Sequence, residues 1–542
     1  MKNLCYLLVA VLIPISVFSQ AMEIAWQQCF GGSEQDNVKD IVEVPGGYLI
    51  VGWTESNNGD ISFNHGGSDG WILKTDSIGN ILWDKTYGGS KGDNFFRIFS
   101  DNSGNYFILG VSNSSDGDIS YDPYTDSWDH WILKIDLEGN IIWDKIIGGN
   151  ESDVLKSGSP TIDGGIVAIG WTYSTDGDIS VNYGSADTWA VKISSEGELE
   201  WDYTIGTDWI DKGQAILATS DGGYLISSNS SIHEDAIGNI TCTPHSYGFF
   251  EGVLFKLDAN LNIEWQRCYG GSNDDGIFGI LEIEDGYVFT GSTSSNDGDV
   301  SGWHGESDSW IVKLDFDGNI VWQNPLGGSR SESGSNILQT TDEVLISFVS
   351  TYSNNGDVSG NHSQSEFDSD IWFVKLNSEG ELIFQQCFGG EGSEIINFGV
   401  VKKSDNNYVI AAQTDYGPSY DVGCTPHGGN GVDTDWWVFE IDSLDTTGAV
   451  ENEYGKDLVK VYPNPAGEYV VFEFSAPPLV PPTGGKPTAQ IQIFDVFGRE
   501  VLKKPVVSEK TVIDLRNVKK GVYFYRIEIE NKIYTGKVVT QK

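Results

Sequence analysis

The chain alternates apolar and polar residues in short runs that end at glycine, asparagine or aspartate, and this pattern recurs along most of its length. Such alternation predicts half-buried β-strands joined by tight turns. The recurrence is marked by an aromatic residue just ahead of a glycine-marked turn, at intervals of 57 to 64 residues. A period of this length indicates an array or ring of repeated units. The seven markers are Trp26, Trp83, Trp143, Trp201, Trp265, Trp322 and Phe384.

Each repeated unit is predicted to contain four strands, which we call a to d. In the first unit, strand a covers residues 38–44, strand b 48–53, strand c 71–76 and strand d 81–83. A long polar loop separates strands b and c, while glycine and asparagine mark the tighter turns. Helical periodicity is absent from the repeats, so the predicted fold class is all-β.

The order of the strands predicts how the units close into a ring. Strands c and d each occur seven times, but the first d strand, near residues 24–30, precedes every a strand, and the last unit stops after strand c near Asp442. The N-terminal strand is therefore expected to complete the last sheet. We predict a seven-bladed β-propeller at residues 21–442, closed by this N-terminal strand, which leaves only short sheet edges.

The positions of the cysteines within the repeat predict two disulfides. Cys29, Cys268 and Cys387 lie late in d strands, whereas Cys242 and Cys424 lie in b–c loops, each inside the tetrapeptide Cys-Thr-Pro-His. In an up-and-down blade, the b–c loop and the end of strand d lie at the same face. We therefore predict the bonds Cys242–Cys268 and Cys29–Cys424, with Cys387 free. The second bond would lock the ring where the N-terminal strand closes it.

Acidic residues dominate the charge of the chain. It has 79 Asp and Glu against 32 Lys and Arg, a formal net charge of −47, which argues against nucleic acid or an anionic membrane surface as a partner. Five b–c loops repeat one acidic motif, as in Asp116-Gly-Asp118-Ile-Ser. A ring of such carboxylates suits calcium, a cation that prefers several oxygen ligands. The candidate calcium ligands are Asp60, Asp118, Asp178, Asp299 and Asp357.

Turn capping is the alternative explanation of these aspartates. Aspartate and asparagine side chains accept hydrogen bonds from nearby backbone amides without any metal, and the Asp-x-Asp-x-Asp-Gly spacing of a dedicated calcium loop is absent. Turn capping is the favoured interpretation. The d–a loops add Asp36, Asp93, Asp153, Asp211 and Asp275, which we expect at the same face as part of a ring of carboxylates.

Catalytic signatures are not evident in the sequence. It contains no nucleophile elbow, no His-Glu-x-x-His and no phosphate-binding glycine loop. The enlarged b–c loops at 229–250 and 413–434 depart most from the repeat, and their shared Cys-Thr-Pro-His favours disulfide-braced insertions over an active site. We therefore favour a non-enzymatic binding or adhesion module for a glycan or protein ligand. The alternative is a secreted hydrolase or lyase acting on polysaccharide or peptide.

The N-terminus has the features of a signal peptide. Lys2 precedes an apolar run from Leu4 to Phe18, and small Ser19 stands at a plausible cleavage point. Residues 1–20 are therefore predicted to direct export. The repeat that begins Trp310-Ile-Val-Lys-Leu-Asp-Phe-Asp-Gly-Asn resembles the bacterial β-propeller repeat family of exported proteins, which implies the fold but no common activity.

A second domain, at 458–542, follows a linker at 443–457. The domain opens with Tyr462-Pro-Asn-Pro465, and Gly498, Gly521, Tyr523 and Lys537 follow in later motif blocks. These ordered blocks resemble the C-terminal sorting domain of type IX secretion substrates from Bacteroidetes-type bacteria. The resemblance implies a small Ig-like β-sandwich, recognition by the outer-membrane translocon after passage through the periplasm, and removal by a C-terminal signal peptidase. The product would be secreted, or attached to the outer cell surface only after export. The residues that carry the resemblance are Tyr462, Pro463, Asn464, Pro465, Gly498, Gly521, Tyr523 and Lys537.

Overall fold

The computed structural model describes most of the chain as β-strands. The described residues are 22–443, without 102, 125, 246–248, 335, 364, 430 and 432, and 459–540, without 463–468, 475–489, 495–499, 507–509, 517, 520, 530 and 531. All the regular secondary-structure elements in these ranges are β-strands. The described residues therefore include no helix long and apolar enough to cross a membrane. The all-β prediction is confirmed. Two compact units result, one of residues 24–442 and one that includes residues 443–542.

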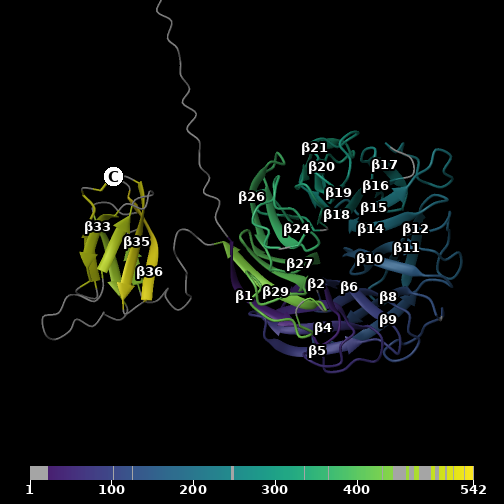
Figure 1. Ribbon diagram of the computed structural model, residues 1–542, viewed down its shortest axis with the longest axis horizontal. Coiled ribbons are helices and arrows are strands. Elements are labelled where there is room, and N and C mark those ends of the chain that lie inside the picture. Colours follow the sequence, from purple (N-terminus) through teal and green to yellow (C-terminus); the bar gives the residue numbers. More distant parts are fainter. Residues whose placement is uncertain are drawn as a thin grey trace, which may run out of the picture. The chain divides into compact units, whose positions relative to one another are not determined.

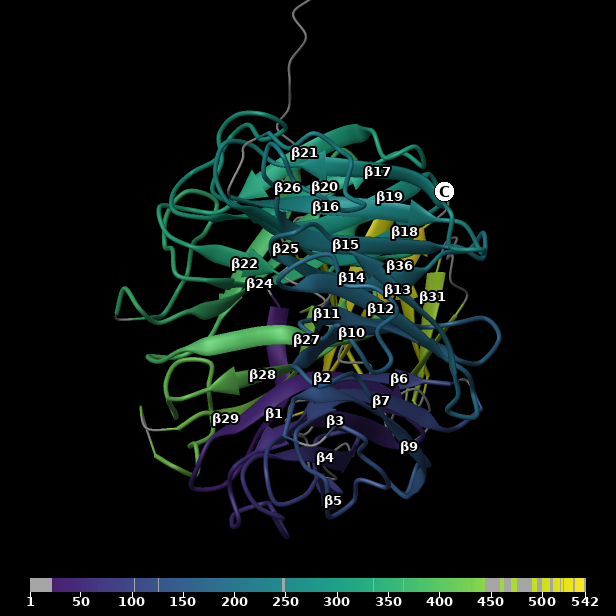
Figure 2. The same ribbon diagram turned by 90° about the vertical axis from the view of Figure 1, so that its right-hand side faces the viewer.

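The larger unit is a ring of antiparallel sheets (Figure 1). Its described residues form seven sheets, which we number as blades 1 to 7 in chain order. Successive blades lie side by side around the ring, as the side view in Figure 2 also shows. The predicted propeller fold is confirmed.

The first four blades each contain four strands in chain order. Blade 1 comprises β2 (Asp36–Val44), β3 (Gly47–Thr54), β4 (Asp69–Asp76) and β5 (Ile81–Tyr87). Blade 2 comprises β6 (Asp93–Ser100), β7 (Tyr106–Ser112), β8 (Asp129–Ile135) and β9 (Ile141–Ile147). Blade 3 comprises β10 (Asp153–Pro160), β11 (Ile166–Thr172), β12 (Asp187–Ile193) and β13 (Leu199–Ile205). Blade 4 comprises β14 (Asp211–Ala218), β15 (Tyr224–Ser231), β16 (Phe250–Leu257) and β17 (Ile263–Tyr269).

The last three blades include one divided inner strand and the strand that closes the ring. Blade 5 comprises β18 (Asp275–Ile283), β19 (Gly286–Thr293), β20 (Asp308–Leu314) and β21 (Ile320–Leu326). In blade 6 the inner strand is split, giving β22 (Glu332–Gly334), β23 (Leu338–Gln339), β24 (Leu345–Thr351), β25 (Asp370–Leu376) and β26 (Leu382–Phe388). Blade 7 comprises β27 (Glu394–Ser404), β28 (Asn407–Thr414), β29 (Asp435–Ser443) and the N-terminal β1 (Met22–Phe30).

The N-terminal strand completes blade 7, as the strand order predicts. Strand β1 pairs with β29, although more than 400 residues separate them. The Trp26 indole N–H donates to Glu440 Oε2 at 2.6 Å, and the Trp437 indole N–H donates to Gln27 Oε1 at 2.9 Å. Side-chain hydrogen bonds therefore reinforce the backbone ladder at the closure.

Both predicted disulfides are present. Cys29 and Cys424 are bonded across the closing strand with their Cα atoms 5.8 Å apart, and Cys242 and Cys268 are bonded within blade 4 at 5.6 Å. Cys387 is free and buried. Burial raises the pKa of its thiol, so Cys387 behaves as an inert core residue rather than a nucleophile.

Aromatic side chains fill the space between neighbouring blades. Trp71 of blade 1 is fully buried against Trp436 of blade 7, with ring centroids 4.1 Å apart. Their cluster also contains Val401 and Val409 of blade 7, so it spans the closure of the ring. The strand-c tryptophans are core residues, whereas the strand-d tryptophans are only partly buried. The strand-c residues are Trp71, Trp131, Trp189, Trp310, Trp372 and Trp437.

The smaller unit contains two antiparallel sheets around a shared core. One sheet consists of β30 (Val459–Tyr462), β31 (Tyr469–Phe474) and β34 (Lys510–Asp514). The other consists of β32 (Gln490–Phe494), β33 (Glu500–Pro505), β35 (Gly521–Ile529) and β36 (Lys532–Thr540). Phe472 and Ile513 from the first sheet pack in one cluster with Ile491 and Ile527 from the second. The unit is therefore a small β-sandwich.

Candidate functional site

Each of the five aspartates predicted as calcium ligands lies at a different junction between neighbouring blades. At the junction of blades 1 and 2, the Gly88 N–H donates to Asp118 Oδ2 at 3.2 Å. The other four accept the equivalent bond from the first glycine of their turn, at 3.2 to 3.4 Å. Asn239 and Asp421 take the same place in the enlarged loops of blades 4 and 7. The sequence motif did not reveal these two because both enlarged loops lack it.

At five of the seven junctions, a histidine side chain contacts acidic side chains of the two neighbouring blades. His65 Nδ1 lies 2.7 Å from Asp69 Oδ2 in its own blade, and its Nε2 lies 3.4 Å from Asp118 Oδ2 in the next blade. Each of these histidines thus ties a strand-c acid to the following b–c loop. Tyr124 takes this place between blades 2 and 3, where it hydrogen-bonds Asp178. The other four histidines are His245, His304, His362 and His427, whose Nδ1 atoms lie 2.5 to 3.1 Å from their strand-c acids.

Two further acidic side chains, one from each blade, are buried together at every junction. One lies at the start of strand c, and the other is the first residue of the innermost strand of the next blade. All of them are at most 3% exposed. We call these the junction pairs. They are Asp435 with Asp36, Asp69 with Asp93, Asp129 with Asp153, Asp187 with Asp211, Glu251 with Asp275, Asp308 with Glu332, and Asp370 with Glu394.

The pair between blades 2 and 3 shows how the carboxyls are held. Asp153 Oδ2 accepts hydrogen bonds from the Gly149 N–H at 2.8 Å and the Ser174 hydroxyl at 3.0 Å, and the Ser127 hydroxyl donates to Asp129 Oδ2 at 2.7 Å. The Oδ1 atoms of both aspartates receive no hydrogen bond from any N–H or hydroxyl group that the structure describes. A proton shared between the two carboxyls would supply the missing hydrogen bond between these oxygens.

Burial raises the pKa of several carboxyls in the junction pairs toward or above neutral pH. It raises the pKa of Asp129 to about 8, with a further contribution from the charge of Asp153. Burial likewise raises the pKa of Asp36 to about 7 and that of Glu394 to about 8. The expectation that Asp36, Asp93, Asp153, Asp211 and Asp275 form an exposed ring of carboxylates is therefore wrong. Each begins an innermost strand, where the neighbouring blade covers it.

The first glycine of each turn leaves room for the junction pair. A Cβ atom on Gly148 would lie 2.0 Å from Asp129 Oδ1 and 2.8 Å from Asp153 Oδ2. We expect Gly148→Ala to lower the free energy of unfolding by about 2–3 kcal/mol, because both carboxyls must shift in a packed site. Gly222→Ala is the control, because its Cβ meets nothing within 4 Å and only its φ of +87° is unfavourable. That change should cost about 1 kcal/mol. If urea denaturation shows equal losses of unfolding free energy for the two variants, a Cβ atom at position 148 is not crowded by the junction pair.

Calcium binding at the predicted aspartates stays a prediction. In the described parts of the chain, no three or more His, Cys, Asp or Glu side chains are grouped so as to hold a metal ion. The backbone hydrogen bonds to Asp60, Asp118, Asp178, Asp299 and Asp357 agree with the alternative, in which these residues fix their turns.

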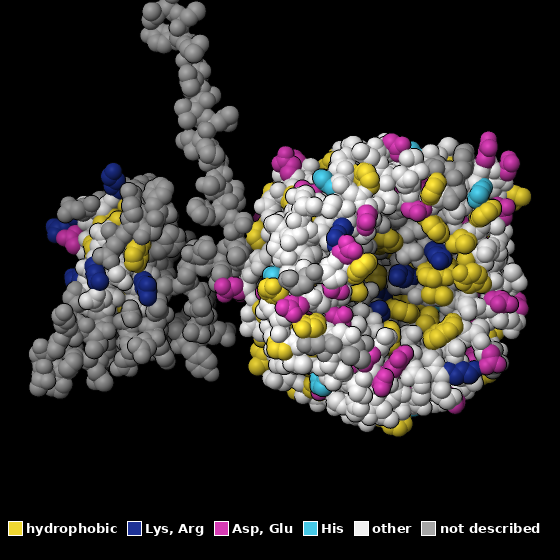
Figure 3. Space-filling view, viewed as in Figure 1, with side chains coloured by type: hydrophobic (Ala, Val, Ile, Leu, Met, Phe, Trp, Pro, Cys, Tyr) yellow, Lys and Arg dark blue, Asp and Glu magenta, His cyan; other side chains and the backbone are white. Residues whose placement is uncertain are grey.

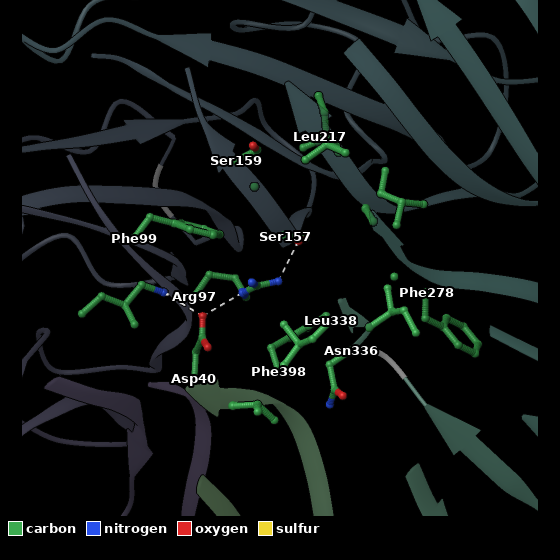
Figure 4. Close-up of a pocket in the computed structure, with 18 of the residues that line it drawn as sticks. Asp40, Arg97, Phe99, Ser157, Ser159, Leu217, Phe278, Asn336, Leu338 and Phe398 are labelled. Carbon is green, nitrogen blue, oxygen red and sulfur yellow. Dashed lines mark hydrogen bonds and ion pairs between the residues drawn. The ribbon is translucent and has the colours of Figure 1, made fainter. Parts of the chain in front are cut away.

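A cavity of about 340 Å³ lies in the central channel of the ring, and strands or loops from all seven blades line it (Figure 4). The innermost strands line this cavity, and most of them carry a β-bulge that begins two residues after their first acid. The bulges follow Val38, Phe95, Leu155, Gly213, Ile277 and Ile396. A bulge leaves a residue out of the pairing and redirects its side chain, which makes it a common device beside binding sites.

Arg97 occupies the centre of this cavity. Its Nε donates to Asp40 Oδ2 and its Nη1 donates to Ser157 Oγ, both at 2.9 Å, so the guanidinium connects blades 1, 2 and 3 (Figure 4). The guanidinium carbon also lies 4.1 Å from the ring centroid of Phe398 of blade 7. Asp40 and Arg97 are the charged residues that line this cavity, and they neutralise one another.

The residues of the predicted sorting signal are described only in part. Tyr462 lies in β30, Gly521 and Tyr523 in β35, and Lys537 in β36. The Tyr523 hydroxyl donates to the Lys519 carbonyl at 2.9 Å, which anchors the start of β35 to the preceding loop. Pro463, Asn464, Pro465 and Gly498 lie outside the described residues, as do the predicted signal peptide and residues 444–457 of the linker.

Comparison with protein families identifies the smaller unit. Residues 460–541 match the family described as a secretion system C-terminal sorting domain. No curated protein matches the chain. The sorting domain and the two disulfides indicate export by type IX secretion to the cell surface or the extracellular space.

Solved structures resemble the chain weakly. The Pan2 WD40 domain of Neurospora crassa aligns with a TM-score of 0.39 at 11% identity, covering 78% of this chain and 96% of that domain. Apocarotenoid oxygenase from Synechocystis aligns with a TM-score of 0.37 at 10% identity, covering 67% of this chain and 73% of the oxygenase. The fold assignment therefore rests on the strand pairing of the chain itself.

Proposed function

We propose that the protein is a non-enzymatic binding module of the cell surface or secreted fraction, and that its ligand enters the central channel. The observation that carries this proposal is the cavity lined by all seven blades, with Phe99, Phe278 and Phe398 beside polar Ser157 and Asn336. Apolar walls with a few fixed polar groups are typical of ligand sites, and about 340 Å³ is enough for a sugar-sized group.

The charges in this cavity favour binding over catalysis. A general acid or base needs a proton that it can exchange with substrate. Asp40 instead accepts hydrogen bonds from Arg97 Nε and from the Ile98 N–H, at 2.9 and 3.2 Å, and is 7% exposed. Burial raises the pKa of Asp40, so this carboxyl is the residue to test if the alternative of a hydrolase or lyase is correct.

Export supplies the cellular setting of the proposal. The sorting domain implies handling by the type IX secretion machinery. We infer that a C-terminal signal peptidase removes this domain and that the propeller is then released or attached to the outer surface. The ligand would be a glycan or protein met outside the cell.

Native affinity electrophoresis tests the proposed function. The purified chain is run through gels that contain neutral or acidic polysaccharides or glycoproteins, and each polymer is then examined for cleavage. We expect retarded migration in at least one gel, with that polymer intact. Cleavage of a polymer that stops in Asp40→Asn would establish the enzyme instead. Unaltered migration in every gel would reject this class of ligand.

A further inference from the structure

The bulges of the innermost strands place two lysines in the channel. Lys39 is the extra residue of the bulge in β2, between Val38 and Asp40, and Lys156 is the extra residue of the bulge in β10, between Leu155 and Ser157. They occupy equivalent positions in blades 1 and 3, and they lie close enough for the charge of Lys156 to act on Lys39. Lys156 lines a second cavity of about 310 Å³.

The second cavity continues the first along the channel. Phe278 and Phe398 line both, so the two cavities are consecutive segments of one passage. The second segment also exposes Gln214 and Tyr352 beside Lys156. Lysine and arginine side chains are visible inside the central hollow in Figure 3, surrounded by hydrophobic ones, while Asp and Glu lie toward the rim.

Neither lysine has an anionic partner in the described structure. No hydrogen bond or ion pair to a described residue involves Lys39 Nζ or Lys156 Nζ, whereas Arg97 is bound to Asp40 and Ser157. Burial and the nearby Lys156 lower the pKa of Lys39 to about 8, and burial lowers the pKa of Lys156. Two mutually repelling ammonium groups in a half-buried channel are costly unless an anion joins them.

We propose that Lys39 and Lys156 together bind an oxyanion of the ligand, the carboxylate of an acidic sugar or a sulfate ester. This inference rests on the proposed channel site and adds the class of ligand. Ammonium groups form charge-assisted hydrogen bonds with such oxygens, and Phe278 and Phe398 offer apolar surface to the ring that carries the anion.

Titration calorimetry of the full chain with glucuronate and with inorganic sulfate tests this site. Wild type is compared with Lys39→Met and Lys156→Met, which keep the aliphatic part of each side chain, and with the surface control Lys91→Met. We expect at least one probe to bind, and either channel variant to weaken binding about tenfold while the control leaves it unchanged. Glucuronate alone would indicate an acidic sugar, and both probes would indicate a general oxyanion site. Binding that is unaffected by both channel variants, or no binding of either probe, would overturn the proposal.

The pH dependence gives a second readout that needs no variant. Besides Lys156, the charged residues that line the two cavities are Asp40 and Arg97, which are paired, while Gln214, Phe278 and Asn397 are uncharged; Lys39 adjoins Asp40 in β2. An oxyanion favours the protonated form of Lys39, so affinity should fall as pH rises from 7 to 9, with protons taken up on binding at pH 8. Affinity that is constant over this range would contradict the assignment.

The oxyanion site at Lys39 and Lys156 and the proposed binding of a polymer can be rejected independently of one another. Retardation in acidic polysaccharide gels that persists in the Lys39→Met/Lys156→Met double variant would keep the binding function and reject the anion site. Lysine-dependent binding of sulfate without retardation by any polymer would keep the anion site and reject the polymer ligand.

Discussion

The Cys29→Ser/Cys424→Ser double variant is expected to lose about 5 kcal/mol of unfolding free energy. This disulfide joins residues 395 positions apart. A cross-link of that span removes much of the conformational freedom of the unfolded chain. It also fixes β1 beside β29, at the junction where the ring would otherwise open. Urea denaturation followed by tryptophan fluorescence measures the loss.

The other disulfide provides the matched control. Cys242 and Cys268 are separated by 26 residues and both belong to blade 4, so their removal should cost about 3.5 kcal/mol and leave the closure intact. Limited proteolysis should then release an N-terminal peptide that contains β1, with serine at position 29, from the first double variant only. An equal or greater loss in the blade 4 variant would contradict the role of the long cross-link in closing the ring.

The second large effect is a fall in stability as pH rises from 5 to 9. The junction pairs have folded-state pKa values raised from 3.8 to about 6 for Asp69, about 7 for Asp36 and Asp187, and about 8 for Asp129. A raised folded pKa gives stability that is present below the unfolded pKa and is lost as pH rises through the folded value. The loss should therefore begin near the unfolded pKa of 3.8, be steepest up to about pH 6, and level off near pH 8 as each carboxyl passes its folded pKa.

The size of this effect is several kcal/mol. Each pKa unit corresponds to about 1.4 kcal/mol for an independent group, but the two carboxyls of a close pair do not titrate independently, so their contributions do not simply add. We expect a total loss of at least about 3 kcal/mol over the seven junctions. Carboxylates with lowered pKa values, such as Asp163 and Asp221 at about 2, affect stability only at much lower pH. Urea midpoints measured at half-unit pH intervals will show the transition.

One substitution tests whether the junction pairs cause this pH dependence. Asp129→Asn keeps the shape of the side chain and supplies a permanent N–H donor for Asp153 in place of the shared proton. We expect it to stabilise the protein by about 2 kcal/mol at pH 8.5 and to reduce the slope of stability against pH. Exposed Asp317→Asn is the control and should change neither quantity. A steeper slope in Asp129→Asn would exclude proton sharing at this junction.

The repeat and its closure were predictable from the sequence because they depend on local alternation and on the order of strands. Residues 24–30 could be assigned to the last blade since that blade lacked a d strand, and the Cys29–Cys424 bond then followed from the blade geometry. The tryptophans of strand c were predictable as core residues because each recurs at the same repeat position between apolar neighbours.

The channel site and the junction pairs were not predictable in the same way. Lys39 and Lys156 lie in strands with an ordinary alternation of apolar and polar residues, and this alternation does not reveal that either lysine is special. Their unusual positions come from the bulges in β2 and β10, which the sequence does not show. Asp153 looked like a loop residue because it follows a glycine turn, yet it begins β10 and lies under the neighbouring blade. The available signal was an acid that recurs four residues after the second residue of each turn and accepts the backbone N–H of that residue, as Asp153 does from Gly149.

The central claim is that ligand binds in the channel rather than on the acidic loops, and hydrogen exchange locates binding most directly. Exchange of backbone amides is measured by mass spectrometry with and without the polymer that retards the chain most strongly. The account predicts slower exchange in the innermost strands β2, β6 and β10 near their bulges, with the b–c loops unchanged. Protection confined to the b–c loops that contain Asp60, Asp118 and Asp178 would contradict it.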